Sequence, residues 1–379
     1  MKNFQTYFLV FLAFFFACKK ESQKSPVIFN FTPSQGSVGT LVYIHGLRFD
    51  SVTDHITVSF NGVTTTPTFV NGDSLIAAAA PAGISTGKIM VTVNGRSTTS
   101  SDDFVFLPDN WTSLAKLPAN LGRSYGVGFS IGNKGYFGMG NDLTNANDDL
   151  YEYDPSTNSW TQKSSMGKNL QLGMSFVING KAYVGIGKTD FPDFTNSFYE
   201  YDPALDKWTQ KADFPGEERY LPVGLAIGNK GYVGLGGYGE NDWWEYDPAS
   251  NTWTRKADLA FSMVPQNPVG FAISDKGYVI GSFVTGPVSF EGGVIEYNPS
   301  TDTWVRKKNF PGGAISDMIG VGTNDKGFLI GYGGFWIYDP SSDLWQEKGL
   351  NSPHGGISGF FINNKLYYES GLDLSVYAP

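Results

Sequence analysis

The chain has 379 residues and a formal net charge of −9, and only 17% of its residues are charged. No cluster of Lys and Arg offsets this negative charge, which excludes nucleic-acid binding through phosphate neutralisation. The length allows two domains with their own cores, and the 47 glycines and 15% aromatic residues, with almost no apolar residues at helical spacing, predict an all-β protein.

Residues 1–17 are predicted to be a signal peptide. An apolar run from Tyr7 to Ala17 is shorter than the roughly 20 residues of a membrane-spanning helix, and Cys18, the only cysteine, follows it. This run, followed by "CKKES", resembles the lipoprotein signals of Bacteroidota. The resemblance implies that Cys18 is lipidated, that residues 18–25 form a polar tether, and that the protein is anchored to the outer membrane, on its periplasmic or its exposed face.

Residues 26–106 contain short alternating apolar runs that are separated by turns rich in Pro and Gly. The segments "TPSQGSVGT", "IHGLRF", "VSFNG" and "GKIMVTV" occur in this order. They resemble the IPT/TIG Ig-like domain. This implies a two-sheet sandwich that serves as a spacer or a binding module.

From Trp111 onward the sequence repeats at intervals of 41 to 51 residues. A Gly-rich strand, a variable loop, Tyr-Asp-Pro or Tyr-Asn-Pro, and a Trp seven residues after the Tyr recur five times. The pairs are Tyr153 and Trp160, Tyr201 and Trp208, Tyr246 and Trp253, Tyr297 and Trp304, and Tyr338 and Trp345. These units resemble kelch repeats, which implies a β-propeller over residues 107–379. The Tyr and Trp rings are expected to pack between neighbouring sheets.

The two ends of this region complement each other. Trp111 has no Tyr before it, and Tyr377 has no Trp after it. The strand around Trp111 is therefore predicted to complete the last sheet and to close a six-bladed propeller. A second repeated pattern predicts cross-strand ion pairs on four of the sheets. Its members are Glu152, Glu200, Glu245 and Glu296, paired with Lys163, Lys211, Lys256 and Lys307.

The loops predict which rim of the propeller binds a partner. The turns between the first and second strands ("GNKG", "SDKG") and between the third and fourth strands ("DPxxxx") are uniform. All variation in length falls on the opposite rim, which we call the variable rim. A rigid scaffold with diverse loops on one side favours a binding surface there, around the mouth of the central channel.

Aromatic and charged residues of the variable rim are the candidate site. Stacking of a glycan, or contact with a protein, is predicted at Phe191, Phe194, Tyr220, Phe261, Phe283 and Phe290. Arg123, Glu217, Glu218 and Arg219 are added as candidate binding residues. With Tyr220 they are also the acid–base set of the alternative function, a sugar-modifying enzyme similar to kelch-fold epimerases; the plainer interpretation of these charges is a solvated loop.

The other enzyme class that resembles this fold is excluded by its ligands. Galactose oxidases use copper, a Tyr–Cys crosslink and two histidines, whereas His354 is the only histidine after residue 107 and no cysteine follows Cys18. No cofactor is expected. The sequence therefore predicts a lipid-anchored binding module, with catalysis as the less favoured alternative.

Overall fold

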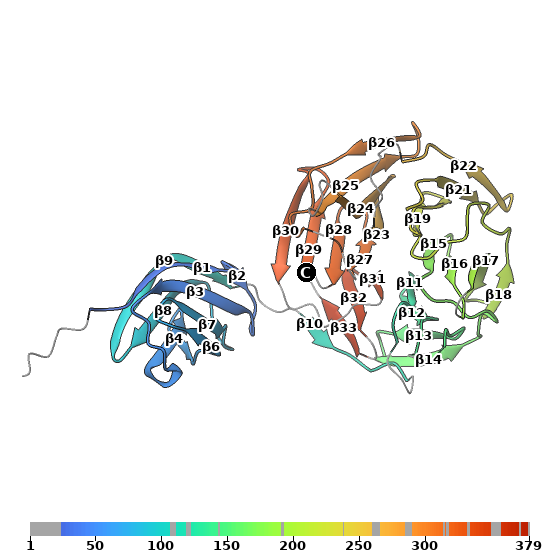
Figure 1. The fold of residues 1–379 in the computed structure, drawn as a ribbon. Coiled ribbons are helices and arrows are strands. Elements are labelled where there is room, and N and C mark those ends of the chain that lie inside the picture. Colours follow the sequence, from blue (N-terminus) through green and yellow to red (C-terminus); the bar gives the residue numbers. More distant parts are fainter. Residues whose placement is uncertain are drawn as a thin grey trace, which may run out of the picture.

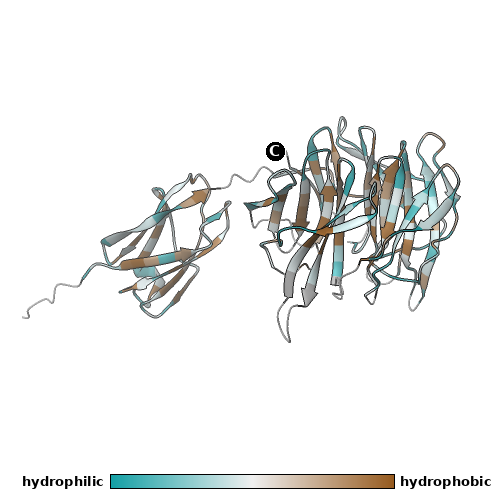
Figure 2. Ribbon diagram, turned by 90° about the horizontal axis from the view of Figure 1, so that it is seen from above, coloured by the Kyte–Doolittle hydropathy of each residue, from teal (hydrophilic) through white to brown (hydrophobic). Residues whose placement is uncertain are grey.

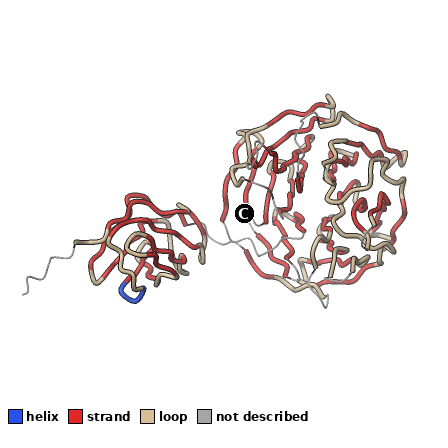
Figure 3. Tube along the Cα trace, viewed as in Figure 1, coloured by secondary structure: helices blue, strands red, loops and turns tan. Residues whose placement is uncertain are grey.

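The computed structural model describes residues 24–106, 111–118, 123–142, 145–190, 193–237, 239–259, 266–284, 290–313, 315, 318–331, 334–349, 358–370 and 373–377. Within them the fold is all-β, as the sequence predicts, and the one helical element is a 3-10 turn, η1 (Thr53–His55) (Figure 3). None of the described helical residues forms a helix that could cross a membrane. The predicted signal peptide and Cys18 lie outside the described residues.

The first domain packs two sheets face to face. Their strand orders are β1-β3-β7-β6 and β2-β9-β8-β4-β5. The bounds are β1 Val27–Thr32, β2 Gln35–Gly36, β3 Leu41–Leu47, β4 Ile56–Phe60, β5 Val63–Thr65, β6 Phe69–Asn71, β7 Leu75–Ala79, β8 Gly87–Val93 and β9 Arg96–Phe106. Strand β3 alternates exposed and buried residues, so that Val42 and Ile44 enter the core. Phe60 and Phe104 meet edge to face there, with centroids 5.2 Å apart.

The rest of the chain forms six four-stranded antiparallel sheets arranged around a common centre (Figure 1). Each of the first five consists of four consecutive strands. The first three are β11 Val127–Ile131, β12 Lys134–Gly138, β13 Leu150–Asp154 and β14 Ser159–Lys163; β15 Met174–Ile178, β16 Lys181–Lys188, β17 Phe194–Asp202 and β18 Lys207–Gln210; and β19 Val223–Ile227, β20 Lys230–Gly234, β21 Trp243–Asp247 and β22 Thr252–Arg255. The next two are β23 Gln266–Ile273, β24 Lys276–Val284, β25 Phe290–Asn298 and β26 Thr303–Arg306; and β27 Met318–Gly322, β28 Gly327–Gly331, β29 Gly334–Asp339 and β30 Leu344–Gly349.

The sixth sheet combines the two ends of this region. Its strands are β31 Ser358–Ile362, β32 Lys365–Ser370, β33 Asp373–Tyr377 and, from more than 200 residues earlier, β10 Trp111–Ser113. Trp111 pairs with Tyr377, and its ring also packs against Phe335 of the neighbouring sheet at 5.5 Å. The strand around Trp111 is thus the edge strand of the last sheet.

The innermost strands approach one another closely. Strands β11, β15, β19, β23, β27 and β31 contact each other in this order, and β31 contacts β11. A Cβ on Gly128 would lie 1.8 Å from Ser358 Oγ, and one on Gly224 would lie 2.5 Å from Met174 Sδ. A side chain at either position would force the facing Ser358 or Met174 side chain to move, so these positions favour glycine.

The uniform turns tie each sheet to its neighbour. The Tyr and Trp of all five hairpins contact each other, with centroids 4.7 to 5.1 Å apart, and the Tyr rings are buried as predicted. The sequence analysis overlooked a third member, an Asn or Asp five residues after the Tyr. Asn251, for example, has a positive φ of 55° and accepts hydrogen bonds from Tyr246 Oη and from Ala212 N. Trp253 Nε1 donates to the carbonyl of the same Ala212.

The predicted Glu–Lys pairs are confirmed. The Nζ–Oε distances are 3.9 Å for Lys163 and Glu152, 3.6 Å for Lys211 and Glu200, 3.8 Å for Lys256 and Glu245, and 3.6 Å for Lys307 and Glu296. Each carboxylate also accepts a hydrogen bond from a Tyr of the second strand, as Glu200 does from Tyr183. Each Glu therefore links strands of its own sheet, and the sheets include most of the hydrophobic residues in Figure 2.

Candidate functional site

The innermost strands enclose a cavity of about 470 Å³. All six sheets contribute to its wall. One lining residue from each is Val127, Met174, Val223, Val269, Met318 and Ser358. The cavity opens where the connections between sheets enter the first strands, which is the variable rim.

Residues with left-handed backbone conformation stand at this mouth. Tyr125, Leu172, Leu221 and Asn267 have φ values of 62°, 55°, 51° and 48°, and all line the cavity. A non-glycine residue in this region costs about 1–3 kcal/mol unless its surroundings impose it. Backbone hydrogen bonds do so here: Leu172 N donates to Tyr125 O at 3.0 Å, and Leu221 N donates to Leu172 O at 2.7 Å. These backbone hydrogen bonds link the first three sheets at the mouth.

Three aromatic rings lie at this mouth. The Tyr125 side chain is 47% exposed. Phe194 and Tyr220 stack on each other, with centroids 6.1 Å apart and planes 29° apart. The structure therefore brings Phe194 and Tyr220 together, as their place in the candidate site requires. Tyr125 was missed, although it lies only two residues after the candidate Arg123.

The other predicted aromatic residues are described only in part. Phe283 lies on β24 and Phe290 on β25, which pair with each other as a hairpin. Phe191, Phe261 and the loop histidine His354 lie outside the described residues.

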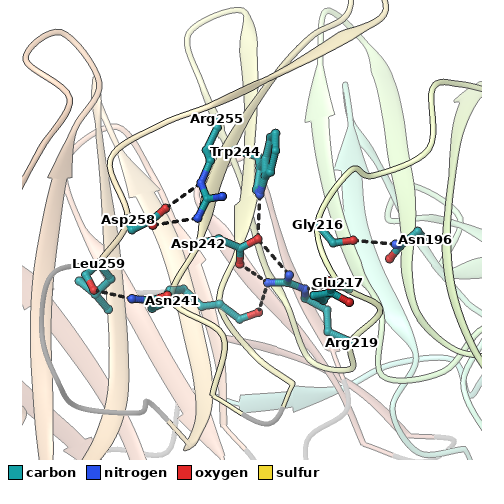
Figure 4. Close-up of polar contacts among 11 residues, drawn as sticks. Asn196, Gly216, Glu217, Arg219, Asn241, Asp242, Trp244, Arg255, Asp258 and Leu259 are labelled. Atoms are coloured by element: carbon teal, nitrogen blue, oxygen red, sulfur yellow. Dashed lines mark hydrogen bonds and ion pairs between the residues drawn. The ribbon is translucent and has the colours of Figure 1, made fainter.

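Arg219 lies in the protein interior. Its guanidinium forms a bidentate ion pair with Asp242, in which Nη1 contacts Oδ1 and Nη2 lies 3.0 Å from Oδ2 (Figure 4). It also donates to Leu235 O and Glu217 O and lies 5.0 Å above the Phe214 ring. These contacts join the connection before β19 to the connection between β20 and β21, so the buried Arg219 side chain stabilises the variable rim.

Arg123 repeats this arrangement in another sheet. Its Nη2 lies 2.5 Å from Asp149 Oδ2, its Nη1 contacts Oδ1 and Met139 O, and it is 7% exposed. Burial alone would lower the pKa of Arg123, but the hydrogen bonds and charge of Asp149 raise it above its usual value. Arg123 therefore stays charged and paired.

The candidate acid–base set does not converge. The side chains of Glu217 and Glu218 are exposed, and within the described residues neither forms an ion pair with Arg219 or Arg123. The structure joins each arginine instead to an aspartate just before the third strand of its sheet. These aspartates had no signal of their own in the sequence, because they stand among other acidic and polar loop residues.

A buried acid lies near the Arg123–Asp149 ion pair. Glu369 on β32 is fully buried, and neither of its carboxyl oxygens has a hydrogen-bond partner among the described residues. Burial raises the pKa of Glu369 well above its usual range, the charge of Arg123 lowers it, and Asp373 raises it further. The register could have identified this position, since the equivalent residues are Gly138, Gly185, Gly234, Ile280 and Ile330.

Within the described residues, no three side chains of His, Cys, Asp or Glu are arranged to hold a metal ion. The site as described consists of an apolar and polar cavity, three aromatic rings, and loops whose two arginines are already neutralised. Such an arrangement can stack on a ring and form hydrogen bonds through backbone, Ser and Asn groups.

Comparisons with known proteins agree with this architecture. Residues 26–106 match the IPT/TIG domain family. Kelch-like protein 21 of Rattus norvegicus and that of Danio rerio are each 35% identical over 74 residues, which is 20% of this chain and 12% of theirs. The chain thus spans about an eighth of the length of these curated relatives.

Two solved structures share the fold. A structural genomics protein of unknown function from Bacteroides thetaiotaomicron is 13% identical, with a TM-score of 0.51, over 94% of this chain and 99% of that one. YjhT is 15% identical, with the same TM-score of 0.51, over 82% of this chain and 96% of that one. The chain therefore contains an IPT/TIG domain followed by a propeller-like set of sheets with a partial likeness to kelch repeats.

Proposed function

We propose that this protein is a lipid-anchored envelope protein that binds a glycan or protein partner at the mouth of its cavity. The exposed ring of Tyr125 and the Phe194–Tyr220 stack on the same rim carry the proposal. Aromatic faces fixed on a folded rim bind ligands at little entropic cost, and an exposed ring such as that of Tyr125 offers a face on which the C–H groups of a sugar can stack.

The second part of the proposal is that the six sheets form a closed six-bladed propeller. The pairing of β10 with β33 and the contact of β31 with β11 support it. Closure leaves only the short outer strand of each sheet as an edge and fixes the six loop sets on one rim. The rim can then act as one surface.

The alternative of a sugar-modifying enzyme has less support. It needs an acid and a base that converge on one substrate atom. Glu217 and Glu218 are exposed, whereas Arg123 and Arg219 are bound to Asp149 and Asp242. The arrangement favours binding.

Partner capture tests the binding role. The full chain is applied to a glycan array and used as bait in envelope extracts, beside a Tyr125→Asn variant. Asn accepts the left-handed backbone of this position, so the change removes the ring without disturbing the mouth. The control is Leu205→Ser, at a residue 71% exposed in a uniform turn on the opposite rim.

We expect the wild type and the control to retain the same ligand and Tyr125→Asn to lose it. If the array gives no hit and the extract no partner, the binding role is wrong. The anchor is tested separately: labelled fatty acid should be incorporated by the wild type and not by Cys18→Ser.

A further inference from the structure

The charge around the cavity restricts what it can bind. No Asp, Glu, Lys, Arg or His is among the described residues that line it. The polar side chains there belong to neutral residues such as Ser175, Asn267 and Ser358. An anion in the cavity would therefore lack a counter-charge from these walls.

The nearest arginines do not supply that counter-charge. Arg219 precedes the lining residue Tyr220 but is fully buried in its bidentate pair with Asp242. Arg123 lies two residues before Tyr125 and is bound in the same way to Asp149. Each pair is internally neutral, so neither guanidinium is available for a carboxylate, sulfate or phosphate.

Exposed acids flank both members of the aromatic pair in the sequence. Asp193 is adjacent to Phe194, and Asp190 is in the same connection. Glu217 and Glu218 precede Tyr220 by two or three residues. All four are exposed, and the whole chain carries a formal charge of −9. Their summed field repels anions that approach the mouth.

From these observations we infer that the cavity takes a neutral sugar ring, the end or a branch of a glycan, and selects against sugars that carry an anionic group. The inference rests on the proposed binding function and specifies its ligand. The C–H face of the ring stacks on Tyr125 and on the Phe194–Tyr220 pair. Its hydroxyl groups bond to Ser, Asn and backbone groups, and a volume of about 470 Å³ lies within the range of small-ligand sites.

Titration calorimetry with matched glycans tests this selectivity. The probes are neutral oligosaccharides that bind on the array, and the same oligosaccharides capped with sialic acid or ending in glucuronate. The full chain should bind each neutral form at least tenfold more tightly than its acidic form. The ratio should shrink as salt rises from 0.05 to 0.5 M (about 14 to 4 Å of screening length), because screening weakens the repulsion.

Three variants locate the effect. Tyr125→Asn should lower the affinity for neutral glycans at least fivefold, whereas Tyr43→Ala, at an exposed aromatic residue of the first domain, should leave it unchanged. The double variant Glu217→Lys, Glu218→Lys should reduce the neutral-to-acidic ratio at least threefold. Its circular dichroism spectrum is compared with the wild type to confirm that it folds.

The outcomes separate the two proposals. Acidic glycans that bind as tightly as neutral ones would overturn the selectivity while the binding function stands. A protein captured at Tyr125 with no glycan bound would do the same. Binding that is insensitive to Tyr125→Asn would place the ligand elsewhere and overturn the inference. If nothing binds, the binding function itself fails.

Discussion

Replacing Glu369 by Gln should make the protein more stable at high pH. The folded chain holds the Glu369 proton, because burial raises its pKa well above the usual 4.5. The unfolded chain releases this proton once the pH exceeds about 4.5. Stability is therefore lost as the pH rises between these two pKa values, by about 1.4 kcal/mol per pH unit while the states differ by one proton. Gln cannot ionise, so the variant lacks this slope.

Chemical denaturation followed by tryptophan fluorescence measures the effect on the sheets alone. All nine tryptophans lie at or after Trp111, so the first domain does not contribute. The free energy of unfolding is compared at pH 5, 6, 7 and 8. The stability of the Gln variant relative to the wild type should increase with pH from pH 5 upward, and this increase should stop once the pH passes the folded pKa of Glu369.

Glu200→Gln is the matched control. It should be less stable than the wild type by a constant amount between pH 5 and 8, and this difference should shrink only below about pH 4.5. Burial tends to raise the pKa of Glu200, but hydrogen bonds from Tyr183 and Lys181 outweigh it and lower the pKa below its usual value. Its contribution is present above the unfolded pKa and is lost as the pH falls through the folded one. Parallel stability curves for wild type and Glu369→Gln between pH 5 and 8 would refute the assignment of a buried, protonated Glu369.

Two further predictions concern the contacts that stabilise the two rims. Arg219→Met should lower the free energy of unfolding by about 3–5 kcal/mol, because it leaves Asp242 buried without its partner, and adding Asp242→Leu should recover most of this loss. If Arg219→Met is as stable as the wild type in urea denaturation, the buried ion pair is contradicted. Asn251→Ala should lower the free energy of unfolding by about 1–3 kcal/mol, because it removes the acceptor of Tyr246 Oη and Ala212 N. Asn251→Asp should be nearly neutral, since Asp206 and Asp302 occupy the same position in other turns. Equal shifts in melting temperature for both variants would exclude the hydrogen-bonding role.

Much of the fold could be predicted because its signals are local and repeated. The seven-residue spacing from Tyr153 to Trp160 recurs five times, and each occurrence reports the same hairpin. The unpaired Trp111 and Tyr377 pointed to their common sheet for the same reason. Because the repeat occurs in several copies, each copy can be compared with the others, and a copy that lacks its Tyr or its Trp is recognised as incomplete.

The site was harder to predict because its contacts are specific to single sheets. Arg219 and Asp242 are 23 residues apart, and nothing local distinguishes this buried arginine from a solvated one in "GEERY". Burial of Arg219 follows from the packing of two connections, which sequence spacing does not encode. Glu369, in contrast, could have been recognised from the sequence. The repeat places it in register with Gly138 and Ile280, so an acid is found at a position that is otherwise small or apolar.

The contrast between the rims follows from which atoms are committed to folding. On the uniform rim the side chains themselves make the contacts between sheets, as Asn251 and Trp253 do with Ala212, so each turn must keep those residues. On the variable rim the neighbouring mouths are tied by backbone atoms, as when Leu221 N donates to Leu172 O. Backbone contacts leave the side chain unconstrained, and the same left-handed position holds Tyr125 in one sheet and Asn267 in another. Binding residues can therefore differ from sheet to sheet on this rim without loss of the hydrogen bonds that link neighbouring sheets.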